Sequence, residues 1–272
     1  MHLAAAARHP RQAIRAALRR LRDRRFVSPL GVDADAPVLV LSPHLDDAVI
    51  DCFSVLTGGD LVNVVNVFAG IPAGDFIPSW DRICGARDIA AHVRERIDED
   101  RQALSTLGLA PVNLPFLGEH YRGGAGRPAL SEIAAAVADR VRAASRVVGP
   151  AMLGDPIQDH LVVRSLALAL DAQGMPVTLY ADVPYAIPFG WPHWVTGTQR
   201  NPRVDVDVFW NRFLGQIPQF QRARVRVVAL EPEQATRKLE TMRMYRTQFE
   251  GLDALGVLSN PRVHSYEVFW DL

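Results

Sequence analysis

The chain has 272 residues, of which 49% are hydrophobic, and this is enough to build one large domain around its own core. Thirty Lys and Arg residues balance thirty Asp and Glu residues, so no global field favours nucleic acid or an anionic membrane as a partner. No apolar run approaches the ~18–20 residues of a membrane span, and two cysteines are too few for a disulfide framework. We therefore expect a cytoplasmic protein with no membrane span.

Residues 1–27 form an Arg-rich, Ala-rich segment that predicts a helical extension ahead of a single domain over residues 28–272. Arg8, Arg11 and Arg15 interrupt the apolar run that a secretory signal requires. The segment is compatible with a helix that binds an anionic surface or a partner. A solvated helix without chemistry of its own is the interpretation that we favour.

After residue 37 the sequence alternates between short apolar runs typical of buried strands and longer stretches typical of helices. The predicted strands cover residues 38–41, 61–69, 112–116, 146–148, 177–180, 222–230 and 263–269. The predicted helices cover residues 48–56, 88–107, 128–144, 160–172 and 231–249, and residues 70–79 and 186–201 are predicted loops. This order predicts an α/β fold with a mostly parallel sheet and helices on both of its faces.

Three polar side chains, His44, Asp46 and Asp47, follow the first predicted strand directly and precede a helix. Open parallel sheets bind ligands in the crevice beyond the carboxyl ends of their strands. A hydrolytic zinc site uses about three protein ligands and one open position. Because His44 and Asp47 are three residues apart, a turn at the strand end can aim both side chains at one point.

His160 is the leading candidate for a third ligand, because it follows Asp159 at the start of a helix just beyond another predicted strand. Asp46 then remains as a general base beside the water molecule that the metal acidifies. The alternative is that His44-x-x-Asp47 binds no metal, since this spacing is common. A nucleotide site in the same crevice is disfavoured, because no Gly-x-Gly-x-x-Gly follows the first strand.

The segment Pro43-His44-Leu45-Asp46-Asp47 resembles the His-Pro-Asp-Asp signature of the PIG-L/LmbE-type zinc-dependent N-deacetylases, with Leu45 where Pro is usual. Asp159-His160 resembles the end of the family's His-x-Asp-His motif. Further similar segments lie at residues 80–82, 96–100, 107–108, 114–117, 121–122, 180–186 and 238–252, so the resemblance covers roughly residues 36–272.

The resemblance implies a Rossmann-like three-layer α/β fold and one Zn²⁺ per chain, with another divalent metal as the alternative, held by His44, Asp47 and His160. It implies that Asp46 is the general base, and that Asp159 orients a nearby imidazole or protonated group. The implied reaction removes an N-acetyl or other N-acyl group from an amino sugar or an amino-sugar conjugate, a small-molecule substrate.

One position departs from the family pattern, because Ile157 stands where the first His of His-x-Asp-His is usual. That His polarises the carbonyl or protonates the leaving amine, and Ile does neither. Three alternatives follow. His120, His193 or His264 takes over this role, or the reaction is slower, or the protein is a non-catalytic metal- and sugar-binding relative.

Other residues are candidates for substrate contacts or for structural roles near the crevice. Arg96 and Glu99 are interpreted as a structural ion pair beneath the site. Aromatic side chains of the 186–201 loop, Trp191 among them, are of the kind that stacks on sugar rings. The candidate substrate-binding residues are His120, Arg122, Tyr185, His193 and Trp194.

Overall fold

The computed structural model describes residues 36–123, 126–153, 157–187, 190–197, 205–215 and 217–272. All of these residues belong to one compact unit, Asp35–Leu272. The predicted Arg-rich extension over residues 1–27 lies outside the described residues. None of the helices in the described ranges combines the length and the apolar character needed to cross a bilayer.

The described strands are β1 (Val38–Ser42), β2 (Val62–Asn66), β3 (Val112–Asn113), β4 (Arg146–Pro150), β5 (Val177–Tyr180), β6 (Arg224–Ala229) and β7 (Tyr266–Asp271). They form one seven-stranded sheet with the order β3-β2-β1-β4-β5-β7-β6. The first five strands along the chain pair in parallel, and only β7 runs in the opposite direction, between β5 and β6. The predicted mostly parallel α/β sheet is confirmed.

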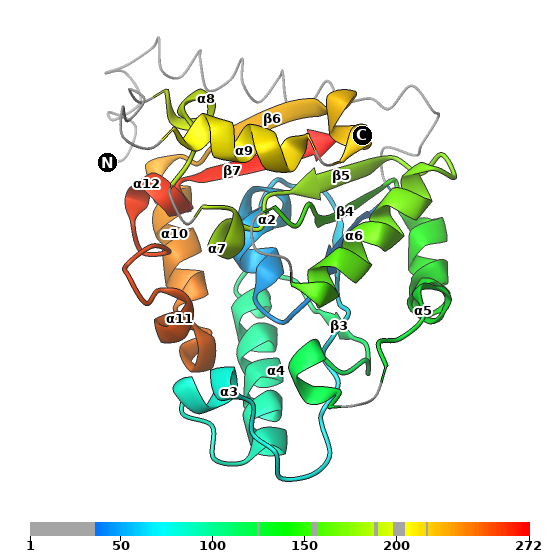
Figure 1. The fold of residues 1–272 in the computed structure, drawn as a ribbon, viewed down its shortest axis with the longest axis vertical. Coiled ribbons are helices and arrows are strands. Elements are labelled where there is room, and N and C mark those ends of the chain that lie inside the picture. Colours follow the sequence, from blue (N-terminus) through cyan, green and yellow to red (C-terminus); the bar gives the residue numbers. More distant parts are fainter. Residues whose placement is uncertain (1–35, 124–125, 154–156, 188–189, 198–204, 216) are drawn as a thin grey trace, which may run out of the picture. The chain divides into compact units, whose positions relative to one another are not determined.

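The described helices are α2 (Asp47–Leu56), α3 (Ser79–Ile83), α4 (Ile89–Ser105), α5 (Leu130–Ala143), α6 (Gln158–Asp171), α7 (Val183–Ala186), α8 (His193–Thr196), α9 (Val206–Leu214), α10 (Pro232–Met242), α11 (Arg246–Leu252) and α12 (Pro261–His264), with the 3₁₀ turns η1 (Glu119–Tyr121) and η2 (Pro218–Gln221). α2 packs against β1, β2 and β7, and α6 packs against β4 and β5. Figure 1 shows α5 and α6 on one side of the sheet and α2, α4 and α10 on the other, which gives three layers.

β1 is an interior strand of the sheet, and all five of its residues, Val-Leu-Val-Leu-Ser, are buried. From β1 the sheet extends through β2 to β3 on one side, and through β4 to β5 on the other. The strand order therefore reverses between β1 and β4, and ligand crevices in such sheets lie at this switch point. As a result, the residues that follow Ser42 and those that follow Pro150 meet at one edge of the sheet.

A buried ion pair between α10 and β7 includes the carboxylate that holds α2 against the sheet. Lys238, the only lysine of the sequence, donates to Glu267 Oε1 on β7 over 2.7 Å, and both side chains are fully buried. The Glu267 carboxylate also accepts the backbone N–H groups of Phe53 and Ser54, just after α2 bends at Cys52. This contact fixes the helix whose first residue is Asp47.

The prediction of one continuous helix over residues 231–249 is wrong, because the helix is interrupted between α10 and α11. Tyr245, at the break, donates its hydroxyl to the buried carboxylate of Asp100 on α4, 2.8 Å away. The Glu99 carboxylate accepts the N–H and the hydroxyl of Thr247, and so caps the start of α11. Tertiary contacts with α4 therefore end the helical run, and helical periodicity does not reveal them.

Four other features differ from the sequence prediction. The 61–69 strand is shorter, since β2 ends at Asn66, and the 186–201 loop includes the short helix α8. The amphipathic helix α9 was not predicted, although it buries Trp210 against Trp270 of β7. His264, expected in the terminal strand, lies instead in α12.

Candidate active site

The turn between β1 and α2 is braced by two of its own side chains. Ser42 Oγ donates to the carbonyl of His44 over 2.6 Å and accepts the N–H of Ala48 over 3.1 Å. Asp47 Oδ2 accepts the N–H of His44 over 2.7 Å. These bonds fold residues 42–48 tightly, and for this reason a spacing of three residues brings the side chains of His44 and Asp47 to one point.

Three ligand atoms converge at the switch point of the sheet, from His44, Asp47 and His160. His44 Nδ1 and His160 Nε2 are 3.2 Å apart, and each of them lies 3.4 Å from Asp47 Oδ2. A tetrahedral ion with bonds of ~2.0–2.1 Å has its ligand atoms ~3.3–3.4 Å apart. The triangle therefore fits one face of a tetrahedral metal site, and the donor set of two imidazoles and a carboxylate suits zinc.

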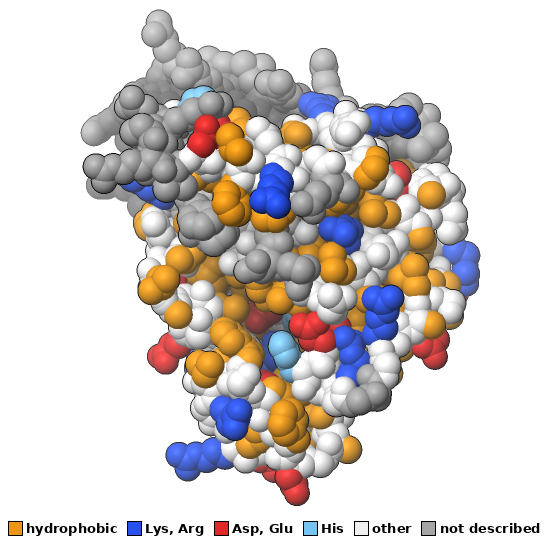
Figure 2. Space-filling model, viewed as in Figure 1, with side chains coloured by type: hydrophobic (Ala, Val, Ile, Leu, Met, Phe, Trp, Pro, Cys, Tyr) orange, Lys and Arg blue, Asp and Glu red, His pale blue; other side chains and the backbone are white. Residues whose placement is uncertain are grey.

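The triangle opens to solvent on one side. The His44 side chain is 20% exposed, whereas the side chains of Asp47 and His160 are 5% and 0% exposed. Figure 2 shows a hollow in this face of the molecule, where acidic, basic and histidine side chains meet. This arrangement leaves a fourth corner for a water molecule or a substrate, as a catalytic site requires.

A buried carboxylate lies behind each of the two histidines. Asp159 Oδ2 is 3.3 Å from His44 Nε2, and Asp182 Oδ1 is 2.6 Å from His160 Nδ1. Carboxylates in such positions orient the imidazoles of metal sites. The sequence identified Asp159 in this role but assigned none to Asp182. The available signal was its position, directly after β5 at the same edge of the sheet.

Burial and charge act in opposite directions on the His44 and Asp47 side chains. Burial disfavours the charged imidazole of His44, but the carboxylates of Asp159 and Asp47 outweigh it and raise the His44 pKa to about 10. Burial also disfavours the charged carboxylate of Asp47, but His160 and His44 outweigh it and hold the Asp47 pKa below its usual range. The pocket thus has a strong preference for positive charge next to Asp47.

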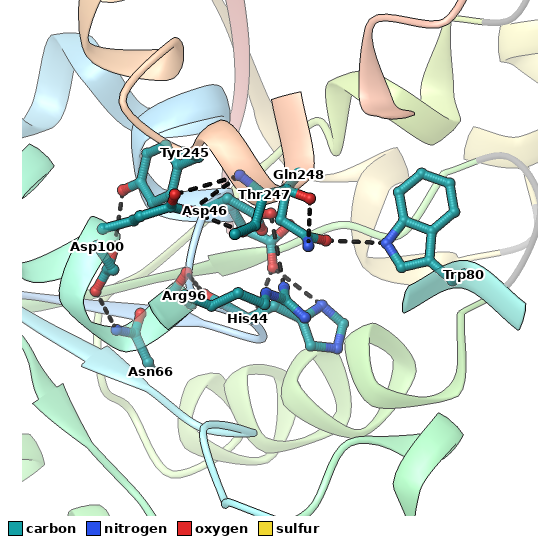
Figure 3. A network of polar contacts seen from close by, with 12 residues as sticks. His44, Asp46, Asn66, Trp80, Arg96, Asp100, Tyr245, Thr247 and Gln248 are labelled. Atoms are coloured by element: carbon teal, nitrogen blue, oxygen red, sulfur yellow. Dashed lines mark hydrogen bonds and ion pairs between the residues drawn. The ribbon is translucent and has the colours of Figure 1, made fainter. Parts of the chain in front are cut away.

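Asp46 directly precedes Asp47 in the chain, and Arg96 of α4 is its cationic neighbour (Figure 3). Arg96 Nη2 is 3.8 Å from Asp46 Oδ2, and its Nη1 is 3.4 Å from the hydroxyl of Tyr121, which donates to Asp81. Burial, followed by the charge of Asp47, raises the pKa of Asp46, and Arg96 opposes this rise. A carboxylate with a raised pKa next to a candidate metal ligand is suited to accept a proton.

The interpretation of Arg96 and Glu99 as an ion pair beneath the site is wrong. Arg96 pairs with Asp46, whereas the Glu99 carboxylate faces the start of α11, where it accepts from Thr247 and lies 3.4 Å from Arg246 Nε. The two residues are three apart on α4, yet they serve different neighbours. Arg96 belongs to the candidate site, and Glu99 belongs to the helix packing.

Two of the candidate substrate-binding residues contact the site residues themselves. Arg122 Nη2 donates to Asp159 Oδ1 over 2.7 Å, and its Nη1 donates to the carbonyl of Leu117. The Tyr185 ring packs edge-on against the imidazole of His160, with 5.3 Å between ring centroids. Arg122 therefore supports Asp159, and Tyr185 forms part of the wall beside His160.

The aromatic side chains around α8 pack mainly against one another. Trp191 and Trp194 both contact Trp210 of α9, and the Trp191 indole donates to the carbonyl of Val263. Trp191 is buried and Trp194 is half-buried. These contacts favour a packing role over the sugar stacking that the sequence suggested.

The three histidines considered as replacements for the missing motif His lie in different environments. His264 is buried and its Nδ1 faces the carbonyl of Leu258, 3.1 Å away, so it is engaged within its own segment. His193 is exposed at the start of α8. His120 is exposed next to Glu119, whose N–H donates to Asp159, so its backbone borders the site. Ile157 itself is the residue that precedes α6, and it makes no side-chain cap.

The fold and the site together define a class of protein: an α/β protein with a candidate His-Asp-His metal centre, and a carboxylate beside it, at the switch point of the sheet. No protein-family model matches the sequence, and neither does the sequence of any curated protein. Solved structures do match the fold.

One match is a triple mutant of a deacetylase involved in the teicoplanin biosynthetic pathway, with 26% identity, 86% of this chain and 97% of that chain covered, and a TM-score of 0.62. A second is the zinc inhibited form of teicoplanin deacetylase, with 25% identity, coverage of 86% and 97%, and a TM-score of 0.57. N,N'-diacetylchitobiose deacetylase from Pyrococcus horikoshii matches in fold, with 16% identity, coverage of 95% and 91%, and a TM-score of 0.52. These neighbours belong to the PIG-L/LmbE family of N-acetyl-sugar deacetylases, and the resemblance that the sequence motifs indicated is confirmed.

Proposed function

We propose that this protein is a zinc-dependent N-deacetylase that removes an N-acetyl or other N-acyl group from an amino sugar or an amino-sugar conjugate. The observation that carries the proposal is the triangle of His44 Nδ1, Asp47 Oδ2 and His160 Nε2, next to which Asp46 pairs with Arg96. The neighbouring structures are deacetylases, and one of them is named as a zinc inhibited form. In this proposal His44, Asp47 and His160 hold the ion.

When bound, zinc supplies Lewis-acid polarisation of the acyl carbonyl and lowers the pKa of water at the site. Asp46 accepts the proton of the attacking water and returns it to the nitrogen that leaves. The C–N bond of the amide breaks, and the products are a carboxylate and a free amine. The charge of Arg96 favours the ionised form of the Asp46 carboxylate and so opposes the effect of burial.

Ile157 has a definite consequence in this mechanism. An aliphatic side chain donates no hydrogen bond to the developing oxyanion, and the loss of one such donor lowers the rate by ~10²–10³ in hydrolases. We therefore expect a slow enzyme unless another donor serves the carbonyl. The second candidate function, a relative that binds metal and sugar without turnover, follows from the same residue.

The test is release of acetate from N-acetylglucosamine conjugates, glycopeptides included, by protein loaded with one equivalent of zinc. One equivalent avoids excess metal, because a neighbour is known in a zinc inhibited form. Asp46→Asn is expected to lower kcat by ~10²–10⁴ while zinc binding persists. Asp139→Asn is the matched control, because the Asp139 side chain is 88% exposed on α5.

Two results would contradict the proposal. If Asp46→Asn keeps full turnover, Asp46 is not the base. If the wild-type protein binds zinc but hydrolyses no N-acyl amino sugar, the non-catalytic alternative is correct.

A further inference from the structure

Asp182 holds two donors from separate parts of the chain. Its Oδ1 lies 2.6 Å from His160 Nδ1, and its Oδ2 accepts the backbone N–H of Met152, which follows β4. The side chains of Asp182 and His160 are both fully buried. Met152 is the one described non-glycine residue with a positive φ, 48°, which is a backbone conformation that L-residues rarely adopt. Both oxygens of the carboxylate are therefore committed.

The backbone around Asp182 is itself fixed. Its carbonyl accepts the N–H groups of Tyr185 and Ala186 in α7. The N–H of Val183 donates to Asp51 Oδ1 over 2.9 Å. Asp51 lies one turn after Asp47 on α2, so a single helix supplies a candidate metal ligand and also secures the segment that holds Asp182.

These contacts determine which nitrogen of His160 carries a proton. A neutral imidazole has one N–H and one lone pair, and an ionised carboxylate only accepts. Opposite Asp182, the proton therefore belongs on Nδ1. The lone pair is then on Nε2, which faces Asp47 Oδ2 and His44 Nδ1.

We propose that Asp182 is a positioning residue that holds His160 as the Nδ1–H tautomer and so presents the lone pair of Nε2 to the metal ion. The inference rests on the proposed function, because it assigns a role toward the ion. Asp182 acts through His160, since its two oxygens face His160 Nδ1 and the N–H of Met152.

An amide in place of the carboxylate distinguishes this role from simple packing. Asn has nearly the same shape as Asp, but it offers one acceptor and one donor group, whereas His160 Nδ1–H and Met152 N–H both need acceptors. If the Asn oxygen accepts from Met152, its NH₂ faces Nδ1 and favours the Nε2–H tautomer of His160. The proton then occupies the nitrogen that the metal needs.

The first measurement requires no metal, and it needs a variant only to assign the His160 signal. Long-range ¹H–¹⁵N spectra of metal-free wild-type protein at pH 7.5 report the tautomer of each histidine, with the His160 signal assigned from a His160→Gln sample. We expect Nδ1–H for His160. His264 is the internal reference, because its Nδ1 faces the carbonyl of Leu258. An Nε2–H tautomer at His160 in the wild-type protein overturns the inference.

The second measurement compares zinc affinity by chelator competition in wild type, Asp182→Asn and Asp271→Asn. Asp271 is the matched control, since this β7 carboxylate accepts a hydrogen bond from Thr178 away from the triangle. Asp182→Asn is expected to weaken zinc binding ~10–100-fold and to raise the Nε2–H population of His160. Asp271→Asn is expected to change neither.

The outcomes separate the two claims. If wild-type protein binds no zinc, the proposed function fails, and the tautomer measurement still tests the Asp182–His160 contact. If wild type binds zinc and Asp182→Asn binds it within twofold with its tautomer unchanged, the inference alone is wrong.

Discussion

Zinc binding is expected to release one proton from His44 at neutral pH. The carboxylates of Asp159 and Asp47 raise the His44 pKa to about 10, so this imidazole is protonated in metal-free protein at pH 7.5. An ion that binds His44 Nδ1 must displace a proton, because a protonated imidazole has no free lone pair. An ordinary histidine with a pKa near ~6.5 would release only about one tenth of a proton at this pH.

The magnitude follows from the pKa difference. Deprotonation of a group with a pKa of about 10 at pH 7.5 costs roughly 3–4 kcal/mol, at ~1.4 kcal/mol for each pH unit. The apparent zinc affinity is therefore expected to rise about tenfold for each pH unit between about pH 7 and pH 9. The folding stability of the metal-free protein has the opposite pH dependence. Because the His44 pKa is raised on folding, its stabilising contribution is complete below about pH 6.5 and is lost as the pH rises toward 10.

Isothermal titration calorimetry in buffers of different ionisation enthalpy counts the protons released for each zinc bound. We expect about one proton at pH 7.5. Asp159→Asn removes the carboxylate that contributes most to the raised pKa of His44. The zinc affinity of this variant should therefore reach its plateau at a lower pH than that of the wild type. Release of only about 0.1 proton, with an affinity that is flat above pH 7, would show that His44 is neutral before the metal arrives and would refute this reasoning.

Three further changes test separate parts of the account. Arg96→Gln removes the cation near Asp46, so the Asp46 pKa should rise further, and the acid limb of the kcat/KM profile should move to higher pH. Lys238→Met leaves Glu267 buried without its cation and should lower the free energy of unfolding by ~3–5 kcal/mol in urea, with the double variant Lys238→Met/Glu267→Gln less affected. Ile157→His restores a donor at the motif position, and kcat on N-acetyl substrates should rise by ~10-fold or more.

Each of these variants has its own contrary result, and Arg96→Gln also has a matched control. Arg101→Gln changes an exposed arginine on the same helix as Arg96 and should leave the pH profile in place; an unmoved profile in Arg96→Gln would exclude the proposed support of Asp46. Unchanged stability in Lys238→Met would mean that the α10–β7 contact does not hold α2. Unchanged kcat in Ile157→His, with zinc still bound, would mean that another group already serves the carbonyl.

The part of the site that is formed by neighbouring residues, His44 and Asp47, was predictable from the sequence around them. The apolar run of β1 and the short spacing from His44 to Asp47 are enough to predict a turn that aims two side chains at one point. His160 was predictable because parallel strands end at one edge of a sheet, so a histidine just beyond β4 lies near the end of β1.

The rest depends on contacts that only the folded chain brings together. Asp182 reaches His160 because β5 lies beside β4, and a lone Asp after a strand carries no mark of that pairing. Arg96 was assigned to the wrong carboxylate, because helical spacing shows which side chains share a face but not what faces them. The break between α10 and α11 is set by Asp100 and Glu99 on a distant helix.

The most direct test of the metal centre is anomalous diffraction at the zinc edge from crystals of protein loaded with one equivalent of zinc. We expect one strong peak, bonded to His44 Nδ1, Asp47 Oδ2 and His160 Nε2, with Asp46 beside the open position. A peak bound by other residues, or no peak at these three, would contradict it.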